Sequence, residues 1–206
     1  PGLGTAEPTR EFMRRFFGLH QPKARNQVGF LPLPATPGPS DSASIPLPPT
    51  VVDADGLNLL ASIEDWPDHI PHERCIFTPH PGEMRRLLKV EQLPADLTAC
   101  ASEAAQAWGQ VVVLKGATTI IAHPDGRTLV YDGSNPALAT AGTGDVLAGS
   151  IAGLLAQGLS LFDAAALGVY LHGAAGVRVR DEMGDAGALA SDLLPQLPQA
   201  IRILRG

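Results

Sequence analysis

The chain is poor in charged residues, aromatic residues and cysteine. Of its 206 residues, 17% are charged, 5% are aromatic and two are cysteines, Cys75 and Cys100. Two cysteines so far apart have neither the spacing of a metal site nor the density of a disulfide framework. We therefore expect two buried thiols, Cys75 in a strand and Cys100 in a helix, in a protein of the reducing cytoplasm.

Long apolar runs and an excess of positive charge are also missing. No stretch approaches the roughly 18 apolar residues of a membrane span, and the first residues show no signal-peptide pattern. The formal net charge is −6, which disfavours polyanionic partners. The sequence therefore predicts neither a membrane nor a nucleic acid as a partner.

What the sequence does contain is an alternation of short apolar strands with helices. The pattern predicts strands at residues 50–53, 75–78, 111–115, 118–122 and 128–131, the last two forming a hairpin. It predicts helices at about residues 8–19, 57–63, 82–89, 95–108, 145–157, 161–179 and 192–204. This order indicates one domain over residues 1–206, a three-layer α/β/α sandwich with a mostly parallel sheet.

Two segments depart from that alternation. The chain opens on Pro1-Gly2-Leu3-Gly4, a glycine turn of the kind that follows a strand, although no strand precedes it. We therefore expect an α/β domain that lacks its N-terminal part. Residues about 20–49 are rich in proline and show no periodicity. We predict an insertion outside the sheet core, either mobile or packed on a neighbouring subunit.

The most informative segment is the glycine turn at Gly142-Thr143-Gly144-Asp145, which precedes an apolar helix. Glycines let the backbone present its N–H groups, and a helix N-terminus attracts anions, so the turn predicts a phosphate site. A carboxylate at that position would repel phosphate unless it accepted a proton from an attacking hydroxyl. The alternative is that Asp145 only caps the helix.

Polar residues also follow three of the predicted strands. Asp53 and Asp55 can hold Mg²⁺ through water, or Asp55 can form a turn and helix cap. His80 stands where a substrate contact is common, whereas Glu83 three residues later favours a capping arrangement with Thr78 or His80. Lys115 ends a buried strand, where it can hold a nucleotide phosphate or simply terminate the strand.

His172 lies within the predicted helix of residues 161–179, among small residues. We interpret it as a packed, hydrogen-bonded histidine. The small residues around it favour close helix packing rather than catalysis.

The segment 135–149, which begins Asn135-Pro136 and contains Gly142-Thr143-Gly144-Asp145, resembles the signature of the NAD(P)H-hydrate dehydratases of the ribokinase-like superfamily. Residues 1–4, 51–58, 78–83 and 114–117 resemble other motifs of that family, in the expected order. Ala137, Leu138 and Ala141 stand where glycine, methionine and glycine are more usual. The resemblance runs to about residue 176 and implies a ribokinase-like fold.

The resemblance also implies an activity and a site. The expected reaction is nucleotide-dependent dehydration of (6S)-NAD(P)H hydrate, a form of NADH or NADPH that carries water across a ring double bond. The implied catalytic base is Asp145, and the implied substrate contacts are Gly4, His80 and Asp145. The implied nucleotide contacts are Lys115, Gly116, Ala117, Thr118, Thr119, Ala141, Gly142, Thr143 and Gly144. The co-substrate is ADP or ATP with Mg²⁺, ADP being preferred, and no residue is assigned as a direct metal ligand.

Family members commonly form homotetramers, so a homo-oligomer is expected, and a functional pairing with an NAD(P)H-hydrate epimerase fits the same role. Two other functions stay open. A ribokinase-like kinase of a vitamin precursor would share the glycine turn and Asp145, but would stop at the phosphorylated product. A non-catalytic nucleotide-binding module would bind adenine nucleotide tightly without turnover.

Overall fold

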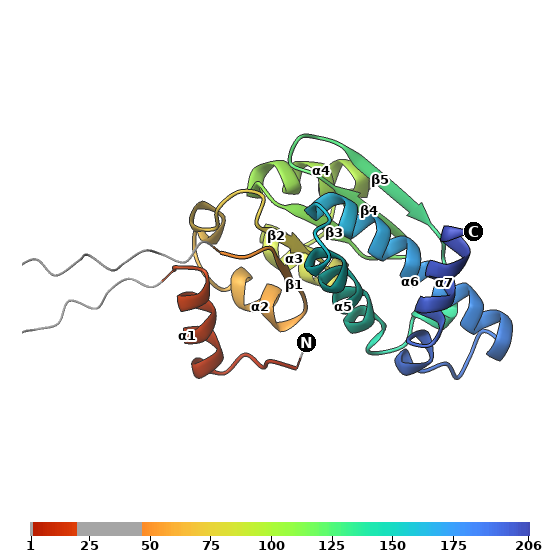
Figure 1. Ribbon diagram of the computed structural model, residues 1–206. Coiled ribbons are helices and arrows are strands. Elements are labelled where there is room, and N and C mark those ends of the chain that lie inside the picture. Colours follow the sequence, from red (N-terminus) through yellow and green to blue (C-terminus); the bar gives the residue numbers. More distant parts are fainter. Residues whose placement is uncertain (1, 20–46) are drawn as a thin grey trace, which may run out of the picture.

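The computed structural model describes residues 2–19 and 47–206, and its centre is a five-stranded sheet (Figure 1). The strands are β1 (Thr50–Val52), β2 (Cys75–Phe77), β3 (Val111–Leu114), β4 (Thr118–Ala122) and β5 (Thr128–Asp132), and they lie side by side in chain order. The first three are parallel, and β4 is antiparallel to both of its neighbours. Four of these strands therefore point the same way, which confirms the mostly parallel sheet.

Helices pack on both faces of this sheet (Figure 1). They are α1 (Glu7–Phe16), α2 (Asp55–Ala61), α3 (Pro81–Leu88), α4 (Leu97–Trp108), α5 (Thr143–Ala156), α6 (Leu161–Met183) and α7 (Gln196–Arg205). The described residues also include three short 3-10 turns: η1 (Trp66–His69) before β2, η2 (Pro136–Leu138) before α5, and η3 (Ala190–Leu193) between α6 and α7. Most of the predicted insertion at residues 20–49 lies outside the described residues.

Side-chain alternation along the strands divides the core between the two faces. In β2, Cys75 and Phe77 join a cluster with α1 to α4, whereas Ile76 joins a second cluster with α5 and α6. All four residues of β3 are buried, because that strand has helices on both of its faces. These two clusters establish the three-layer α/β/α architecture.

The first helical layer is held by large side chains. The ring of Trp66 lies 5.3 Å from the ring of Phe77 and 5.3 Å from that of Trp108, centroid to centroid. These three aromatic residues are buried, and they tie η1 and α4 to the underside of β2. Tilted and edge-on ring contacts of this kind add to the stabilisation that burial of their large apolar surface provides.

The second helical layer is built from small side chains. Helix α6 places Ala164, Ala165 and Gly168 in the buried core against α5. A Cβ atom added to Gly168 would lie 2.5 Å from Ile151 Cγ1, so the glycine lets the two helices approach closely. Further along α6, Ala175 and Val179 pack in a third cluster with α7 and η3.

The prediction of one helix at residues 192–204 is wrong. The chain forms η3, passes through Leu194 and Pro195, and only then begins α7 at Gln196. Proline cannot donate a backbone hydrogen bond and is tolerated only at the start of a helix, so Pro195 separates the two elements.

The predictions for the two cysteines are confirmed in their places and burial. Cys75 lies in β2 and Cys100 in α4, and both are buried free thiols. Burial raises the pKa of the Cys75 thiol to about 12. Neither residue has the exposed thiolate that a reactive cysteine needs.

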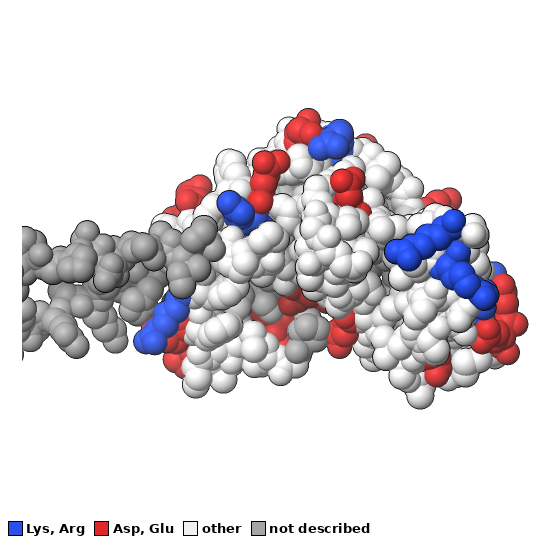
Figure 2. All heavy atoms as spheres, in the orientation of Figure 1, with Lys and Arg blue, Asp and Glu red and all other residues white. Residues whose placement is uncertain are grey.

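The surface carries little charge. Figure 2 shows a mostly uncharged face, with acidic side chains at a recess in its lower centre and basic side chains over α7. The basic residues in the last turn of α7 are Arg202 and Arg205. None of the helices in the described ranges is both long and apolar enough to span a membrane.

Candidate functional site

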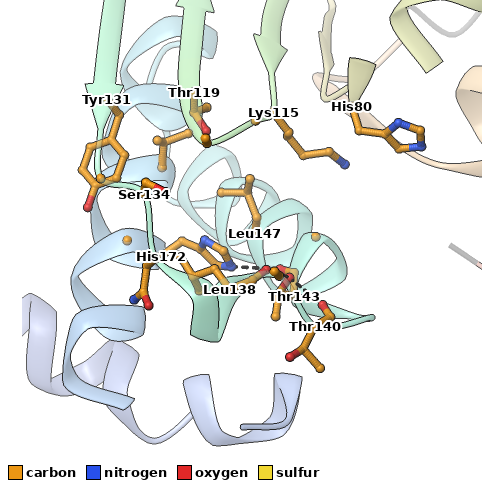
Figure 3. Close-up of a pocket in the computed structure, with 18 of the residues that line it drawn as sticks. His80, Lys115, Thr119, Tyr131, Ser134, Leu138, Thr140, Thr143, Leu147 and His172 are labelled. Carbon is orange, nitrogen blue, oxygen red and sulfur yellow. Dashed lines mark hydrogen bonds between the residues drawn. The ribbon is translucent and has the colours of Figure 1, made fainter. Parts of the chain in front are cut away.

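A pocket of about 820 Å³ lies where the carboxyl ends of the parallel strands meet the N-terminus of α5 (Figure 3). Its wall includes His80 after β2, Lys115 after β3, Thr119 of β4 and Tyr131 of β5. Helices α5 and α6 close the other side. Open α/β sheets bind ligands at this edge, and the volume is in the range of small-molecule sites.

The turn before α5 presents unpaired backbone N–H groups. Gly142 is the N-cap, with a φ of +90° and no side chain to cap the helix. The N–H of Thr143 donates to Thr140 O over 3.3 Å, and that of Asp145 donates to Gly142 O over 3.0 Å. The N–H groups of Gly142 and Gly144 have no acceptor in the described part of the chain. They remain available to an anion.

Lys115 points its ammonium group at this turn while it pairs with Asp53. The distance from Lys115 Nζ to Asp53 Oδ1 is 2.7 Å, and the Asp53 side chain is 4% exposed. A Cβ atom added to Gly144 would lie 3.4 Å from Lys115 Nζ and 3.9 Å from Asp53 Oδ2. Glycine at this position therefore keeps open the space between the ion pair and the helix N-terminus.

The two acids after β1 point at different partners because Ala54 between them has a φ of +48°. Asp53 binds Lys115, whereas Asp55 Oδ2 accepts the N–H of Gly4 over 2.8 Å. Asp55 is the first residue of α2 rather than its cap, so the cap interpretation is wrong. The contact joins the two motifs of residues 1–4 and 51–58, which are far apart in the sequence.

His80 and Glu83 form the capping box that their spacing favours. His80 Nδ1 accepts the N–H of Gly82 over 3.0 Å, and Glu83 Oε2 accepts the N–H of His80 over 2.9 Å. Glu83 is buried, while the His80 side chain is 51% exposed beside the pocket. His80 thus starts α3 and still leaves one edge of its ring accessible to a ligand.

The loop from Lys115 to Thr119 lines the pocket with only part of its residues. Gly116, Ala117 and Thr119 lie on its wall, and Thr118 does not. Successive strand residues point to opposite faces, so Thr118 and Thr119 cannot both face the ligand with their side chains. A contact from Thr118 would have to come from its backbone.

Of the predicted residues in the glycine turn, too, only some line the pocket. Ala141, Thr143 and Gly144 line the pocket, whereas Gly142 and Asp145 lie just beyond its wall. The Thr143 hydroxyl donates to the carbonyl oxygens of Leu138 and Thr140, at 2.8 and 2.9 Å, so it braces the turn. Gly4 is likewise absent from the pocket wall.

Asp145 lies in the first turn of α5 and is exposed. No hydrogen bond within the described ranges involves its carboxylate, so the interpretation of Asp145 as a side-chain cap finds no support. A carboxylate at this position is favoured by the helix dipole, yet it remains free to accept a proton. It stands one residue beyond the unpaired N–H of Gly144.

His172 is packed and hydrogen-bonded, as predicted. Its Nε2 lies 2.9 Å from Thr143 O, and the residue is 8% exposed. Burial lowers its pKa, the Thr143 carbonyl opposes the shift and the nearby Lys115 charge adds to it. His172 also lines the pocket, which the interpretation of a purely packed histidine did not include.

Several wall residues were not identified from the sequence, among them Tyr131, Ser134, Asn135, Leu138, Val169 and Gly173. From the sequence, Asn135 was noted only as the first residue of a motif. In the structure its Oδ1 caps η2 by accepting the N–H of Ala137 over 3.1 Å. Tyr131 is held by glycine, since Cβ atoms at Gly133 and Gly173 would overlap its ring. Only the fold brings these distant residues together.

The chain matches known proteins over most of its length. A family model described as NAD(P)H-hydrate dehydratase matches residues 43–199. The bifunctional NAD(P)H-hydrate repair enzyme of Moorella thermoacetica is 48% identical over 160 residues, which are 76% of this chain and 30% of that protein. The ADP-dependent (S)-NAD(P)H-hydrate dehydratase of Neisseria meningitidis is 44% identical over 151 residues, 71% of this chain and 51% of that protein.

Solved structures show the same fold. An ADP/ATP-dependent NAD(P)H-hydrate dehydratase of Bacillus subtilis, co-crystallised with ATP and Mg²⁺, is 34% identical with a TM-score of 0.64. The match covers 75% of this chain and 56% of that one. A ribokinase-like protein of Enterococcus faecalis reaches a TM-score of 0.70 over 98% of this chain and 61% of its own, at 25% identity. The chain thus spans about a third to a half of the curated relatives.

Proposed function

The chain belongs to the NAD(P)H-hydrate dehydratase family, and from that premise we propose that it uses an adenine nucleotide to dehydrate (6S)-NAD(P)H hydrate. The observation that carries the proposal is the meeting of Lys115, the unpaired N–H of Gly144 and the free carboxylate of Asp145 at one edge of a pocket of about 820 Å³. A cation, a backbone donor and a base are what phosphorylation of a hydroxyl group needs.

Water is a poor leaving group at neutral pH, so the substrate hydroxyl is first phosphorylated. In our proposal Asp145 accepts the hydroxyl proton as its oxygen attacks the terminal phosphoryl group of the nucleotide. The N–H groups of Gly142 and Gly144 stabilise the negative charge that develops there. Phosphate then leaves the ring with the electrons of its C–O bond, and loss of a proton from the neighbouring carbon restores the double bond.

The remaining predicted residues take binding roles in this proposal. Lys115, Gly116, Ala117 and Thr119 hold the nucleotide from the sheet side, with Thr118 limited to its backbone. His80 offers its exposed ring edge to the hydrated nicotinamide. Gly4 is held by Asp55, and through this contact the first residues of the chain reach the strand ends.

The donor groups fit an adenine nucleotide better than they fit a metal held by protein alone. Within residues 2–19 and 47–206, no group of three or more His, Cys, Asp or Glu side chains can hold a metal ion. Mg²⁺ usually takes one or two carboxylates together with substrate phosphates and water. Asp53 and Asp145 are the carboxylates near the phosphate site, where the ion would supply charge neutralisation.

The names of the relatives suggest further properties, which we also propose. Several are bifunctional repair enzymes, so a functional pairing with an epimerase of the hydrate fits this chain. ADP is the preferred co-substrate, as in the Neisseria meningitidis relative, with ATP as the alternative. We also propose a cytoplasmic location, with which two buried free cysteines agree, and a homotetramer, which rests on the family resemblance alone.

The direct test is to incubate the protein with NADH hydrate and ADP or ATP and to follow recovery of nicotinamide absorbance. Recovery that depends on both the protein and the nucleotide is the expected result. Nucleotide consumption with a stable phosphorylated product would indicate a kinase, and tight nucleotide binding without turnover would indicate a binding module. Either outcome would overturn the proposal.

The matched variant is Asp145→Asn. We expect it to lower turnover by at least ~10²-fold, the scale of a lost general base, while ADP affinity holds or improves because a repulsive charge is gone. Glu103→Gln, which removes one exposed carboxylate from α4 in the other layer, is the control and should keep full activity. A near-normal rate in Asp145→Asn would remove this residue from the mechanism.

A further inference from the structure

One nitrogen of His172 is used by neither the fold nor the proposed chemistry. Its Nε2 contacts Thr143 O over 2.9 Å, and its Nδ1 has no partner in the described part of the protein. The residue lines the pocket from the middle of α6. Figure 3 shows the ring standing in the pocket with one nitrogen turned to Thr143 and the other turned away from it.

The hydrogen bond fixes which nitrogen carries the proton. A carbonyl oxygen only accepts, so Nε2 must be the N–H donor. Burial lowers the His172 pKa, and the ring is therefore neutral near pH 7. It follows that Nδ1 is a bare acceptor, held in one orientation and facing the pocket.

The neighbours of His172 place that acceptor between two unlike ends of the pocket. At one end, Lys115 Nζ lies beside Gly144, next to Thr143. At the other end, the Tyr131 ring packs directly against Gly173, the residue after His172. The pocket wall thus runs from Lys115, which is paired with Asp53, through His172 to an aromatic end at Tyr131 (Figure 3).

A nucleotide has the same three parts in the same order. Its phosphates match Lys115 and the N–H of Gly144, and its flat base matches the Tyr131 end. The sugar then lies opposite His172. A bare nitrogen lone pair repels phosphate oxygens and attracts a hydroxyl proton, so the ribose is the part that it suits.

We propose that His172 accepts a hydrogen bond from a ribose hydroxyl of the bound nucleotide and so selects ribonucleotides over deoxyribonucleotides. This inference rests on the proposed nucleotide-dependent function. His172 acts as a specificity residue and, through Thr143 O, also positions the first turn of α5. A neutral hydrogen bond of this kind is worth roughly 1 kcal/mol, which is about fivefold in affinity.

Two substitutions separate these roles. His172→Gln can place an amide N–H near the position of Nε2, which keeps the bond to Thr143 O and removes the acceptor at Nδ1. His172→Asn can place an amide oxygen near the position of Nδ1 but is too short to reach Thr143. Circular dichroism of both variants checks that the fold is kept.

The experiment is calorimetric titration of the whole chain and both variants with ADP, 2′-deoxy-ADP and 3′-deoxy-ADP. We expect the parent to bind ADP about fivefold more tightly than one of the deoxy analogues, and His172→Gln to bind the two equally. His172→Asn should retain part of the preference. A parent without preference, or a Gln variant with the parent's preference, would overturn the assignment. A parent that bound no ADP would instead overturn the proposed function.

Discussion

The two helical layers of this protein reach stability by opposite means. On one face of the sheet, Trp66, Phe77 and Trp108 interlock through their rings and fill the space between helices and strands. On the other face, Gly168 and the alanines of α6 let α5 approach so closely that the Ile151 side chain of α5 packs against the backbone of α6 at Gly168. Packing in the first layer depends on large side chains that fill space, and packing in the second depends on small residues that let the helices come close.

The pocket belongs mainly to the second layer. Helices α5 and α6 supply Gly144, Leu147, Val169 and His172 to its wall, whereas the first layer reaches it only through the start of α3. Gly142 and Gly144 leave two N–H groups at the N-terminus of α5 uncovered by side chains, and exposed N–H groups are what a phosphate site needs. This difference predicts that a substitution in the first layer lowers stability without changing nucleotide affinity, whereas one in the second layer changes both.

The largest effect should come from the first layer. Trp66→Ala empties the centre of the ring cluster and should lower the free energy of unfolding by about 3–5 kcal/mol. Chemical denaturation measures the loss. Nucleotide affinity of the folded fraction should stay unchanged, because Trp66 lies in the layer away from the pocket. A weaker affinity for ADP would show that the layers are coupled.

A smaller but more specific effect is expected in the second layer. In Gly168→Ala the new methyl group would lie 2.5 Å from Ile151 Cγ1, so the buried Ile151 side chain must shift and disturb the contact between α5 and α6. We expect a loss of about 1–3 kcal/mol in unfolding free energy, together with weaker ADP binding as the turn at Gly144 shifts. Thermal unfolding and calorimetry give the two values.

Gly153→Ala is the matched control for this substitution. It lies on α5 with no atom near the new methyl group. It should raise stability by about 0.5–1 kcal/mol, since alanine favours a helix over glycine. A similar gain in Gly168→Ala would contradict the close approach of α5 and α6.

The smallest effect concerns pH. The folded state lowers the His172 pKa, so His172 contributes stability above its ordinary pKa of 6.5 that is lost as pH falls below that value. One proton is worth at most about 1.4 kcal/mol per pH unit. Between pH 7.5 and 5.5, His172→Gln should therefore lose less stability than the parent in denaturation curves. If the unfolding free energies of the parent and the variant fell equally with pH, protonation of His172 would not destabilise the folded state.

Much of the fold could be predicted because its signals are local. Apolar strands such as Val111–Leu114 and the capping pair of His80 and Glu83 can be recognised within a few residues. The sequence predicts one helix across Pro195 because helical spacing of apolar residues continues on both sides of it. The structure instead ends η3 before Pro195 and begins α7 after it. The predicted insertion at residues 20–49 stays a prediction, because most of it lies outside the described residues.

The candidate site was predictable only in part, for a different reason. Lys115 and Gly144 belong to recognisable strand-end and turn motifs, and the fold brings them together. Tyr131 and His172 show no such motif, because their role depends on which distant residue packs beside them. No local pattern shows that Tyr131 rests on Gly173, or that Asp55 reaches back to Gly4.

The strand order of the sheet, β1-β2-β3-β4-β5, is also the order of synthesis. Each of β2 to β5 emerges from the ribosome after the strand that it pairs with, and no described strand must be inserted between two earlier ones. Short separations along the chain lower the loop-closure entropy that slows folding. We therefore expect β1 to β5 to pair in the order in which they are synthesised, and the turn before α5 to take its final shape only afterwards, when α5 docks on strands that are already paired.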